Sequence, residues 1–213
     1  LGGAVACDEC HNVLLSNSVV SKNIAAAGGG IALKGSRGVS LTGTNVFQDN
    51  SATDGGGGGI FTKDQSVLSD ENVASISDNG GNSGLYGPLL GTAPNELRVV
   101  DATLAALHSI VAKNTDVLGV AVRILDKYGN PISGISLKSF FLVASVRSGA
   151  LFGTAEVPVQ KYQTTEFSDM GFAMSEGKYN ISFALNIGSR IITTGLEVAL
   201  LACEPGFSLE GAQ

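Results

Sequence analysis

The residues best suited to chemistry lie near the start of the chain, in the segment Cys7-Asp8-Glu9-Cys10-His11. A Cys-x-x-Cys segment beside a histidine could form half of a zinc site. Zinc takes four ligands, however, and the sequence has neither a second Cys-x-x-Cys nor a spaced pair of histidines. A local Cys7–Cys10 disulfide, or two buried thiols, fits this segment better. We therefore expect no metal. The disulfide candidates are Cys7, Cys10 and Cys203, with the odd cysteine pairing beyond this sequence.

Carboxylates are the other groups that could support catalysis. Hydrolases and lyases need them to converge on one face, as an acid and base pair or as calcium ligands. Here the acidic residues are scattered through expected turns and form no repeated pair; they are Asp49, Asp54, Asp64, Asp70, Glu71 and Asp78. We interpret them as solvated turn residues, with a calcium site in a turn as the alternative. The sequence predicts neither an enzyme nor a bound cofactor.

The composition points to an all-β protein. Lysine and arginine number 13 against 19 acidic residues, so no basic field exists to hold a nucleic acid. The longest apolar runs, 140–146 and 196–203, are too short to form a membrane-spanning helix. Twenty-nine glycines with many Ser, Thr, Asn and Val residues favour short strands joined by tight turns.

Three similar units follow one another in the first 87 residues, beginning at Gly2, Gly28 and Gly57. Each starts with Gly-Gly, continues with an aliphatic residue and ends in an apolar-x-x-Asn element such as Phe47-Gln48-Asp49-Asn50. A unit of this size cannot bury its apolar runs alone, but stacked units can. We predict that equivalent side chains form inward columns: Val5, Ile31 and Ile60; Val13, Val39 and Val67; and Val20, Phe47 and Ile76.

These units predict a right-handed parallel β-helix of about three coils over residues 1–96, without a helix in residues 1–87. The glycine pairs suit corners that need positive φ or close approach of the backbone. Corner positions are also expected for Asn23, Asn50 and Asn79. Asparagine tolerates the left-handed region, and stacked amides can bond along the axis.

The Gly-Gly-x-Ile element paired with Phe-x-x-Asn resembles the repeats of chlamydial polymorphic outer-membrane proteins. Similar repeats occur in large surface proteins of protists and algae. The resemblance covers residues 1–87 and implies a β-helical scaffold. It does not extend to an outer-membrane barrel domain, so we do not expect a bacterial autotransporter.

The periodicity changes after the cluster of Gly, Pro and Thr between residues 86 and 95. Val120, Val122 and Ile124 alternate with other residues, and a turn is expected over 126–131. About seven such strands between residues 97 and 202 suggest an antiparallel sandwich. The segment Val-x-Val-x-Ile-Leu-Asp-Lys-Tyr-Gly-Asn-Pro-Ile-Ser-Gly, with Glu-Gly-Lys-Tyr-Asn-Ile-Ser-Phe later, is similar to immunoglobulin-like modules of filamin and bacterial surface type. This resemblance implies an Ig-like β-sandwich.

The last residues, 203–213, begin with Cys-Glu-Pro-Gly-Phe. They resemble the opening of an ephrin-receptor-like or EGF-like cysteine-rich module, and we interpret them as the start of such a module or as a linker. The order of the three segments is similar to that of giant extracellular proteins of single-celled eukaryotes.

These patterns favour a structural or adhesive segment of a large extracellular or cell-surface protein, such as a filament or flagellar-hair subunit. The expected partners are other protein subunits or flanking domains. Asn180-Ile181-Ser182 is a glycosylation candidate on the outward side of a strand, so glycans are further candidates. The alternatives are a carbohydrate- or ligand-binding surface module and, third, a pectate-lyase-like polysaccharide-degrading enzyme. No nucleic acid and no membrane span are expected in this segment.

Overall fold

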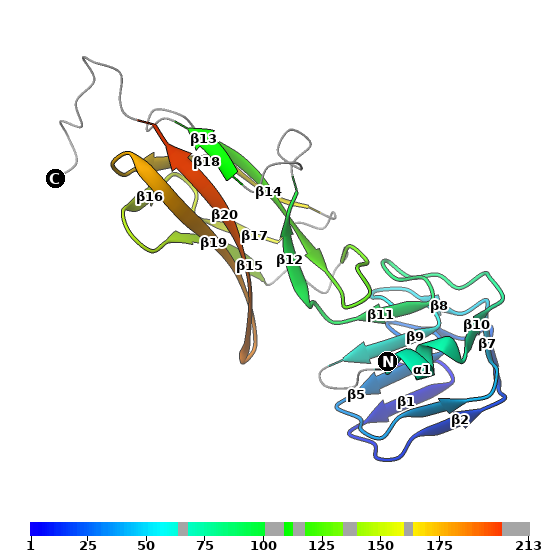
Figure 1. The fold of residues 1–213 in the computed structure, drawn as a ribbon. Helices are drawn as coiled ribbons and strands as arrows, with labels where there is room; N and C mark the ends of the chain where they lie inside the picture. Colours follow the sequence, from blue (N-terminus) through cyan, green and yellow to red (C-terminus); the bar gives the residue numbers. More distant parts are fainter. Residues whose placement is uncertain (64–67, 101–108, 113–117, 134–139, 160–163, 202–213) are drawn as a thin grey trace. The chain divides into compact units, whose positions relative to one another are not determined.

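The computed structural model describes residues 1–63, 68–100, 109–112, 118–133, 140–159 and 164–201. The chain divides into two compact units, Leu1–Asn95 with Leu125–Ser136 and Glu96–Ile124 with Leu137–Gln213. Both are built mainly from β-strands (Figure 1). The protein is all-β, as the composition predicts.

The first unit is a parallel β-solenoid of about three coils. Its strands stack in the orders β1-β5-β9-β11, β2-β6, β3-β7-β10 and β4-β8. The first coil contains β1 (Val5–Asp8), β2 (Leu14–Ser16), β3 (Val19–Ser21) and β4 (Ile24–Ala25). The second contains β5 (Ile31–Lys34), β6 (Ser40–Thr42), β7 (Asn45–Gln48) and β8 (Ser51–Ala52). The third contains β9 (Ile60–Lys63), α1 (Asp70–Ala74) and β10 (Ile76–Asp78), and β11 (Leu90–Thr92) extends the first sheet.

The register of the coils follows the aliphatic repeat. Val5 pairs with Ile31 and Ile31 with Ile60, and Leu90 adds a fourth member to this column. Ile31 and Ile60 are buried in the core of the solenoid, whereas Val5, in the outermost coil, is 37% exposed. The predicted column therefore exists, and burial decreases at its uncovered end.

Val13 and Val39 pack against the core as predicted, and Val67 of that column lies outside the described residues. The predicted column of Val20, Phe47 and Ile76 is offset in the third coil. Val20 pairs with Phe47, which is fully buried. Ile76 pairs with Asn45, two residues before Phe47, and still packs against the same core. Side chains two residues apart on a strand lie on the same face. Ile76 of β10 therefore still faces the core despite the two-residue offset.

A short helix interrupts the second sheet, so the expectation of no helix in residues 1–87 is wrong. The Ser69 hydroxyl accepts a hydrogen bond from the Asn72 N–H and caps α1. Buried Asn72 accepts a hydrogen bond from the Leu41 N–H at 2.7 Å and donates one to the Val39 carbonyl at 3.0 Å. The amide side chain thus satisfies the backbone beside β6 that a third strand would have paired. Because the Asn72 side chain replaces hydrogen bonds of the missing strand, α1 can take the place of that strand in the third coil.

The glycine pairs have the two roles expected of them. Gly28 has a φ of +64°, which suits a corner in the left-handed region. At Gly29, a Cβ atom would lie 2.5 Å from the Gly58 carbonyl oxygen of the next coil. The first glycine therefore bends the chain, and the second allows the coils to approach.

The second unit consists of two sheets, β12-β14-β18-β16 and β13-β20-β19-β15-β17. The pairs β14·β18, β16·β18, β15·β17, β15·β19 and β19·β20 are antiparallel, and β13 pairs with β20 in parallel. Phe167 and Phe183 come from different sheets and their ring centroids are 5.2 Å apart, so the sheets share an apolar core. The strands are β12 (Glu96–Val99), β13 (Ser109–Ala112), β14 (Leu118–Leu125), β15 (Phe141–Val146), β16 (Ala150–Phe152), β17 (Glu156–Pro158), β18 (Thr165–Ala173), β19 (Gly177–Ile187) and β20 (Arg190–Leu200).

One segment belongs to a different unit from the one that its position in the sequence suggests. Leu125–Ser136 lies within the range expected for the second domain, yet it is part of the first unit. The Asn130 side-chain amide donates to the Leu90 carbonyl of β11 at 3.1 Å, and the Ser133 hydroxyl donates to the Leu85 carbonyl at 2.9 Å. These contacts join a turn from the second half of the chain to the last coil.

Candidate functional site

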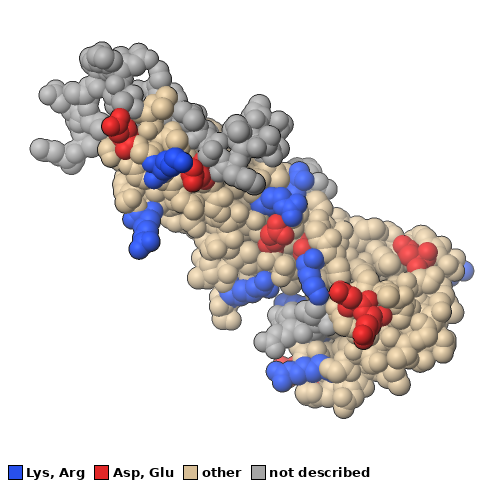
Figure 2. All heavy atoms as spheres, in the orientation of Figure 1, with Lys and Arg blue, Asp and Glu red and all other residues tan. Residues whose placement is uncertain are grey.

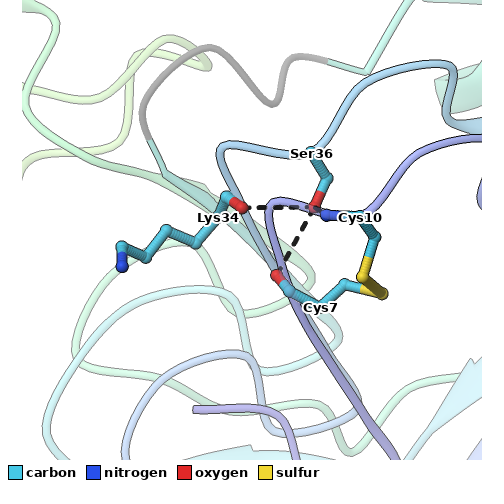
Figure 3. Close-up of a disulfide and its surroundings, with 4 residues drawn as sticks. All are labelled: Cys7, Cys10, Lys34 and Ser36. Atoms are coloured by element: carbon cyan, nitrogen blue, oxygen red, sulfur yellow. Dashed lines mark hydrogen bonds between the residues drawn. A yellow bond between two sulfur atoms is a disulfide. The ribbon is translucent and has the colours of Figure 1, made fainter.

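The first coil of the solenoid contains Cys7 and Cys10, the two cysteines of the Cys-x-x-Cys segment. Cys7 in β1 and Cys10 in the following turn form a disulfide, with their Cα atoms 5.5 Å apart (Figure 3). The Cys10 N–H donates to the hydroxyl of buried Ser36 in the second coil at 3.3 Å. That hydroxyl lies 3.4 Å from the Cys7 carbonyl oxygen and 3.2 Å from that of Lys34. Ser36 thus links the disulfide corner to the next coil. Cys203 lies outside the described residues.

The first coil also exposes large apolar side chains. Leu14, Val19 and Ile24 are 67%, 70% and 71% exposed. Leu14 and Ile24 lie in register with Ser40 and Ser51 of the second coil. Serine thus occupies these outward positions in the second coil, whereas the first coil has aliphatic residues. This difference makes the first coil the more apolar surface and a candidate interaction site.

The backbone of the first coil is open as well. Its four strands each pair with one strand of the second coil and have no other partner among the described strands. Unpaired strand edges are templates for the addition of another strand. A small cavity of about 70 Å³ adjoins this coil, and Val5, Val13 and Leu15 contribute to its lining. The apolar interior is therefore incompletely filled at this end.

A ladder of asparagine side chains runs along one corner of the solenoid. The Asn23 backbone N–H and its side-chain amide both donate to the side-chain oxygen Oδ1 of Asn50, at 3.1 and 2.9 Å. The same two groups of Asn50 donate to Oδ1 of Asn82, at 3.1 and 3.0 Å. The ladder position in the third coil is thus occupied by Asn82. Asn79, which the repeat alignment placed there, is exposed and donates its backbone N–H to the Phe47 carbonyl.

The opposite end of the solenoid is occupied by the turn over residues 125–133. Its central group is the carboxylate of Asp126, which is 1% exposed. Asp126 accepts hydrogen bonds from the N–H groups of Thr92, Tyr128 and Asn130, and from the Asn130 side chain. Burial, reinforced by the negative charge of Asp126, raises the pKa of the Tyr86 and Tyr128 phenols above the usual value of 10.0. The turn therefore covers this end of the solenoid, whereas each strand of the first coil has one edge without a partner among the described strands.

The acidic residues that could have formed a catalytic or calcium site have separate local roles. Asp70 and Glu71 lie in the first turn of α1, where negative charge favours the helix. Asp78 accepts hydrogen bonds from the Gly80 N–H and the Asn82 side chain. Within the described ranges, no group of three or more His, Cys, Asp or Glu residues could hold a metal ion. Asp64 lies outside the described residues.

The second unit presents a polar groove around the glycosylation candidate. Asn180 is exposed on β19, next to Gly195 of β20, where a Cβ atom would lie 2.6 Å from the Asn180 Oδ1 atom. Ser145, Arg147 and Thr193 also line this groove. The arrangement leaves Asn180 accessible on a strand face with hydroxyl groups around it.

On the face shown in Figure 2, acidic and basic residues are interspersed among uncharged ones. In the part of the chain that the structure describes, no helix is both long and apolar enough to cross a membrane.

Two features of these sites could not be found by aligning the repeats. Asn82 has no equivalent at the expected spacing, and Asp126 lies 34 residues from its partner Thr92. The alternating strand and turn around Asp126 were recognisable, but they predicted a hairpin of the second domain rather than a cap. In comparisons with known proteins, no family model matches the chain and no curated protein matches it.

Proposed function

We propose that this chain is a structural or adhesive segment of a large extracellular or cell-surface protein, such as a subunit of a filament or flagellar hair. The observation that carries the proposal is the continuous stacking of the coils. The column from Val5 to Leu90 and the ladder from Asn23 to Asn82 tie each coil to the next. Such stacking makes a solenoid an extended scaffold.

Two further features support a location outside the cell. The Cys7–Cys10 disulfide suits an oxidising compartment. Asn180 is exposed within an Asn-x-Ser sequence, as a glycan acceptor must be. In this proposal the sheets of the second unit form an Ig-like spacer or docking module, and the partners are protein subunits or flanking domains. No residue is catalytic, and the segment binds no cofactor and no nucleic acid.

Surface labelling tests the proposal. An antibody raised against the chain is applied to intact and to permeabilised cells of the source organism. Labelling of intact cells along a surface layer, filament or hair is the expected result. Labelling that appears only after permeabilisation would contradict the proposed location.

Carbohydrate binding is the second candidate, and the polar groove around Asn180 favours it. Hydroxyl and guanidinium groups of Ser145, Arg147 and Thr193 could donate hydrogen bonds to sugar hydroxyls. A glycan array probed with the wild type and with Arg147→Ala tests this candidate. Binding that falls at least tenfold in the variant supports it, and an array without hits rejects it.

A further inference from the structure

We propose that Asn180 carries an N-linked glycan whose first N-acetylglucosamine lies in the polar groove of the second unit, over Gly195 and against Thr193 and Arg147. This inference rests on the proposed location outside the cell, because enzymes of the secretory pathway attach such glycans. It names the occupant of the groove, which is the protein's own glycan. Three features support this occupant: the register of the sheet, the packing at Gly195 and the unpaired polar groups of the groove.

The polar groove lies on the outward face of the sheet that contains β15, β19 and β20. Ser182 pairs with Ser145 of β15 and with Gly195 of β20, so these three residues form one row across the strands. Directly paired residues share a face of the sheet. Ile181 and Leu196, the strand neighbours of this row, are 0% and 2% exposed and belong to the core face. The row itself therefore faces solvent.

Asn180, Thr193 and Arg147 extend this row along the strands. Asn180 lies two residues before Ser182 in β19, and residues two apart on a strand share a face. Thr193 lies two residues before Gly195 in β20, and Arg147 directly follows β15. The groove that they line has a volume of about 620 Å³, within the range that holds a small organic ligand. Both the asparagine and the serine of the Asn-x-Ser sequence thus lie in the groove.

Gly195 provides the space that a sugar on Asn180 needs. A Cβ atom at this glycine would lie 2.6 Å from Oδ1 of Asn180 and 3.2 Å from its Nδ2 atom. The Asn180 amide therefore lies directly over Gly195, where any other residue would push it aside. A sugar joined to Nδ2 begins in the space that the missing side chain leaves.

The polar groups around this space have no partners in the folded chain. Within the described ranges, no side-chain hydrogen bond or ion pair engages Arg147, Asn180 or Thr193. The neighbouring carboxylate of Glu197, which pairs with Asn180 across the strands, forms an ion pair with Lys178 at 3.4 Å. The guanidinium and hydroxyl groups are thus available to donate to the hydroxyl and acetamido oxygens of N-acetylglucosamine.

A tethered sugar fits this groove better than a free one. Asn180, Arg147 and Thr193 are all exposed, so water competes for each hydrogen bond that they make. The described residues that line the groove include no aromatic ring. A free ligand must also give up its translational and rotational freedom on binding. A glycan on Asn180 has already lost that freedom, so weak contacts are enough to hold it.

The covalent step transfers an oligosaccharide from a lipid-linked diphosphate donor. The Nδ2 atom of Asn180 forms a bond to the anomeric carbon of the first N-acetylglucosamine, and the bond from that carbon to the diphosphate oxygen breaks. The amide nitrogen releases one proton, and the lipid diphosphate leaves with the electron pair of the broken bond. The hydroxyl of Ser182 completes the Asn-x-Ser sequence that this reaction requires.

Two preparations of the full chain test the modification. One is secreted from a eukaryotic host that adds high-mannose glycans and is trimmed with an endoglycosidase that leaves a single N-acetylglucosamine. The other is made in a bacterial periplasm, where disulfides form but the Asn-x-Ser sequence is not modified. Intact-mass spectrometry should show the sugar on the secreted wild type and none on secreted Asn180→Gln. A secreted wild type without the sugar would overturn the proposal.

The same two preparations test where the sugar lies. We expect nuclear Overhauser contacts from the acetyl methyl group to the Gly195 α protons and the Thr193 methyl group. Amide exchange in residues 193–195 should be about fivefold slower in the chain that carries the sugar.

Three variants of the secreted chain separate contact from attachment. Gly195→Thr fills the space and Arg147→Ala removes a donor, so each should lose the added protection while mass spectrometry still shows the sugar. Arg37→Ala, at an exposed arginine of the first unit, is the matched control and should keep the protection.

Two further outcomes would overturn the proposal. A sugar on Asn180 without contacts to Gly195, or equal protection in Gly195→Thr and the control, would show a glycan that extends into solvent. Binding of free chitobiose to the periplasmic chain that Arg147→Ala abolishes would make a separate carbohydrate the occupant. None of these readouts depends on where the native protein lies, so they are separable from the surface-labelling test.

Discussion

The carboxylate of Asp126 lies 3.1 Å from the backbone nitrogen of Thr92, and both residues are buried. Thr92 in turn accepts the Lys127 N–H on its hydroxyl oxygen at 2.9 Å. This reciprocal pair joins the final strand of the solenoid to a turn from the second half of the chain. The turn therefore acts as a cap of the coil stack.

Asp126→Asn should destabilise the first unit. The substitution keeps the shape of the side chain but replaces one acceptor oxygen with an amide donor, facing N–H groups that already donate. Hydrogen bonds to a charged acceptor contribute about 1.5–3 kcal/mol each, so we expect a loss of about 3 kcal/mol. Urea unfolding followed by circular dichroism measures it, with exposed Asp54→Asn as the control. Equal stability of the two variants would contradict the role of Asp126 as a cap.

Gly29→Ala should destabilise the solenoid through backbone contact between coils. The new methyl group would lie 2.5 Å from the Gly58 carbonyl oxygen and 2.5 Å from the Ser51 nitrogen, neither of which can move independently of its coil. We expect a loss of about 1–3 kcal/mol. Gly119→Ala is a matched control, since the nearest atom to its Cβ would be the Phe167 carbonyl oxygen at 3.9 Å. A thermal midpoint for Gly29→Ala no lower than that of the control would rule out tight packing here.

Stability should decrease in alkaline solution. Burial and the charge of Asp126 raise the pKa of Tyr86 and Tyr128 in the folded state above the usual value of 10.0. Above pH 10 the unfolded chain releases these phenolic protons while the folded chain retains them. The unfolded state then binds fewer protons, so the free energy of unfolding falls as pH rises.

The double variant Tyr86→Phe with Tyr128→Phe isolates this contribution. The slope of unfolding free energy against pH between 9 and 12 should be shallower than in the wild type. An unchanged slope would show that other groups control the alkaline transition.

Reduction of the Cys7–Cys10 disulfide should weaken the first coil modestly. The bond closes a loop between cysteines three positions apart, and a loop this short contributes about 2 kcal/mol in the chain-entropy model. The double variant Cys7→Ser with Cys10→Ser should match the reduced wild type in thermal midpoint. A reducing agent that lowers the midpoint of the serine variant equally would point to another cause.

The repeat predicted the solenoid because the residues that shape each coil lie close together in the sequence. Two glycines followed by an aliphatic residue recur where each coil turns and where Val5, Ile31 and Ile60 face the interior. That signal depends only on spacing within the chain, and it predicted the first sheet in register.

The repeat spacing did not predict the roles of Asn72, Asn82 and Asp126. Asn72 lies in α1 and hydrogen-bonds to the backbone of Leu41 and Val39, in and next to β6. No equivalent residue in the other two units predicts this role. The third unit contains both Asn79 and Asn82, and only the longer loop through Gly80 and Gly81 brings Asn82 onto the ladder. The Asp126 cap depends on contact between distant segments, which periodicity does not encode.

Because the two ends of the solenoid differ, local unfolding should begin at the first coil and spread toward the last. A linear array loses terminal members first when they have only one neighbour. The disulfide-bearing coil meets that condition, whereas the coil beneath Asp126 is held from both sides. Thermal fraying, proteolytic nicking and the release of amide protons should advance from residue 5 toward residue 90, leaving the coil nearest the cap folded longest.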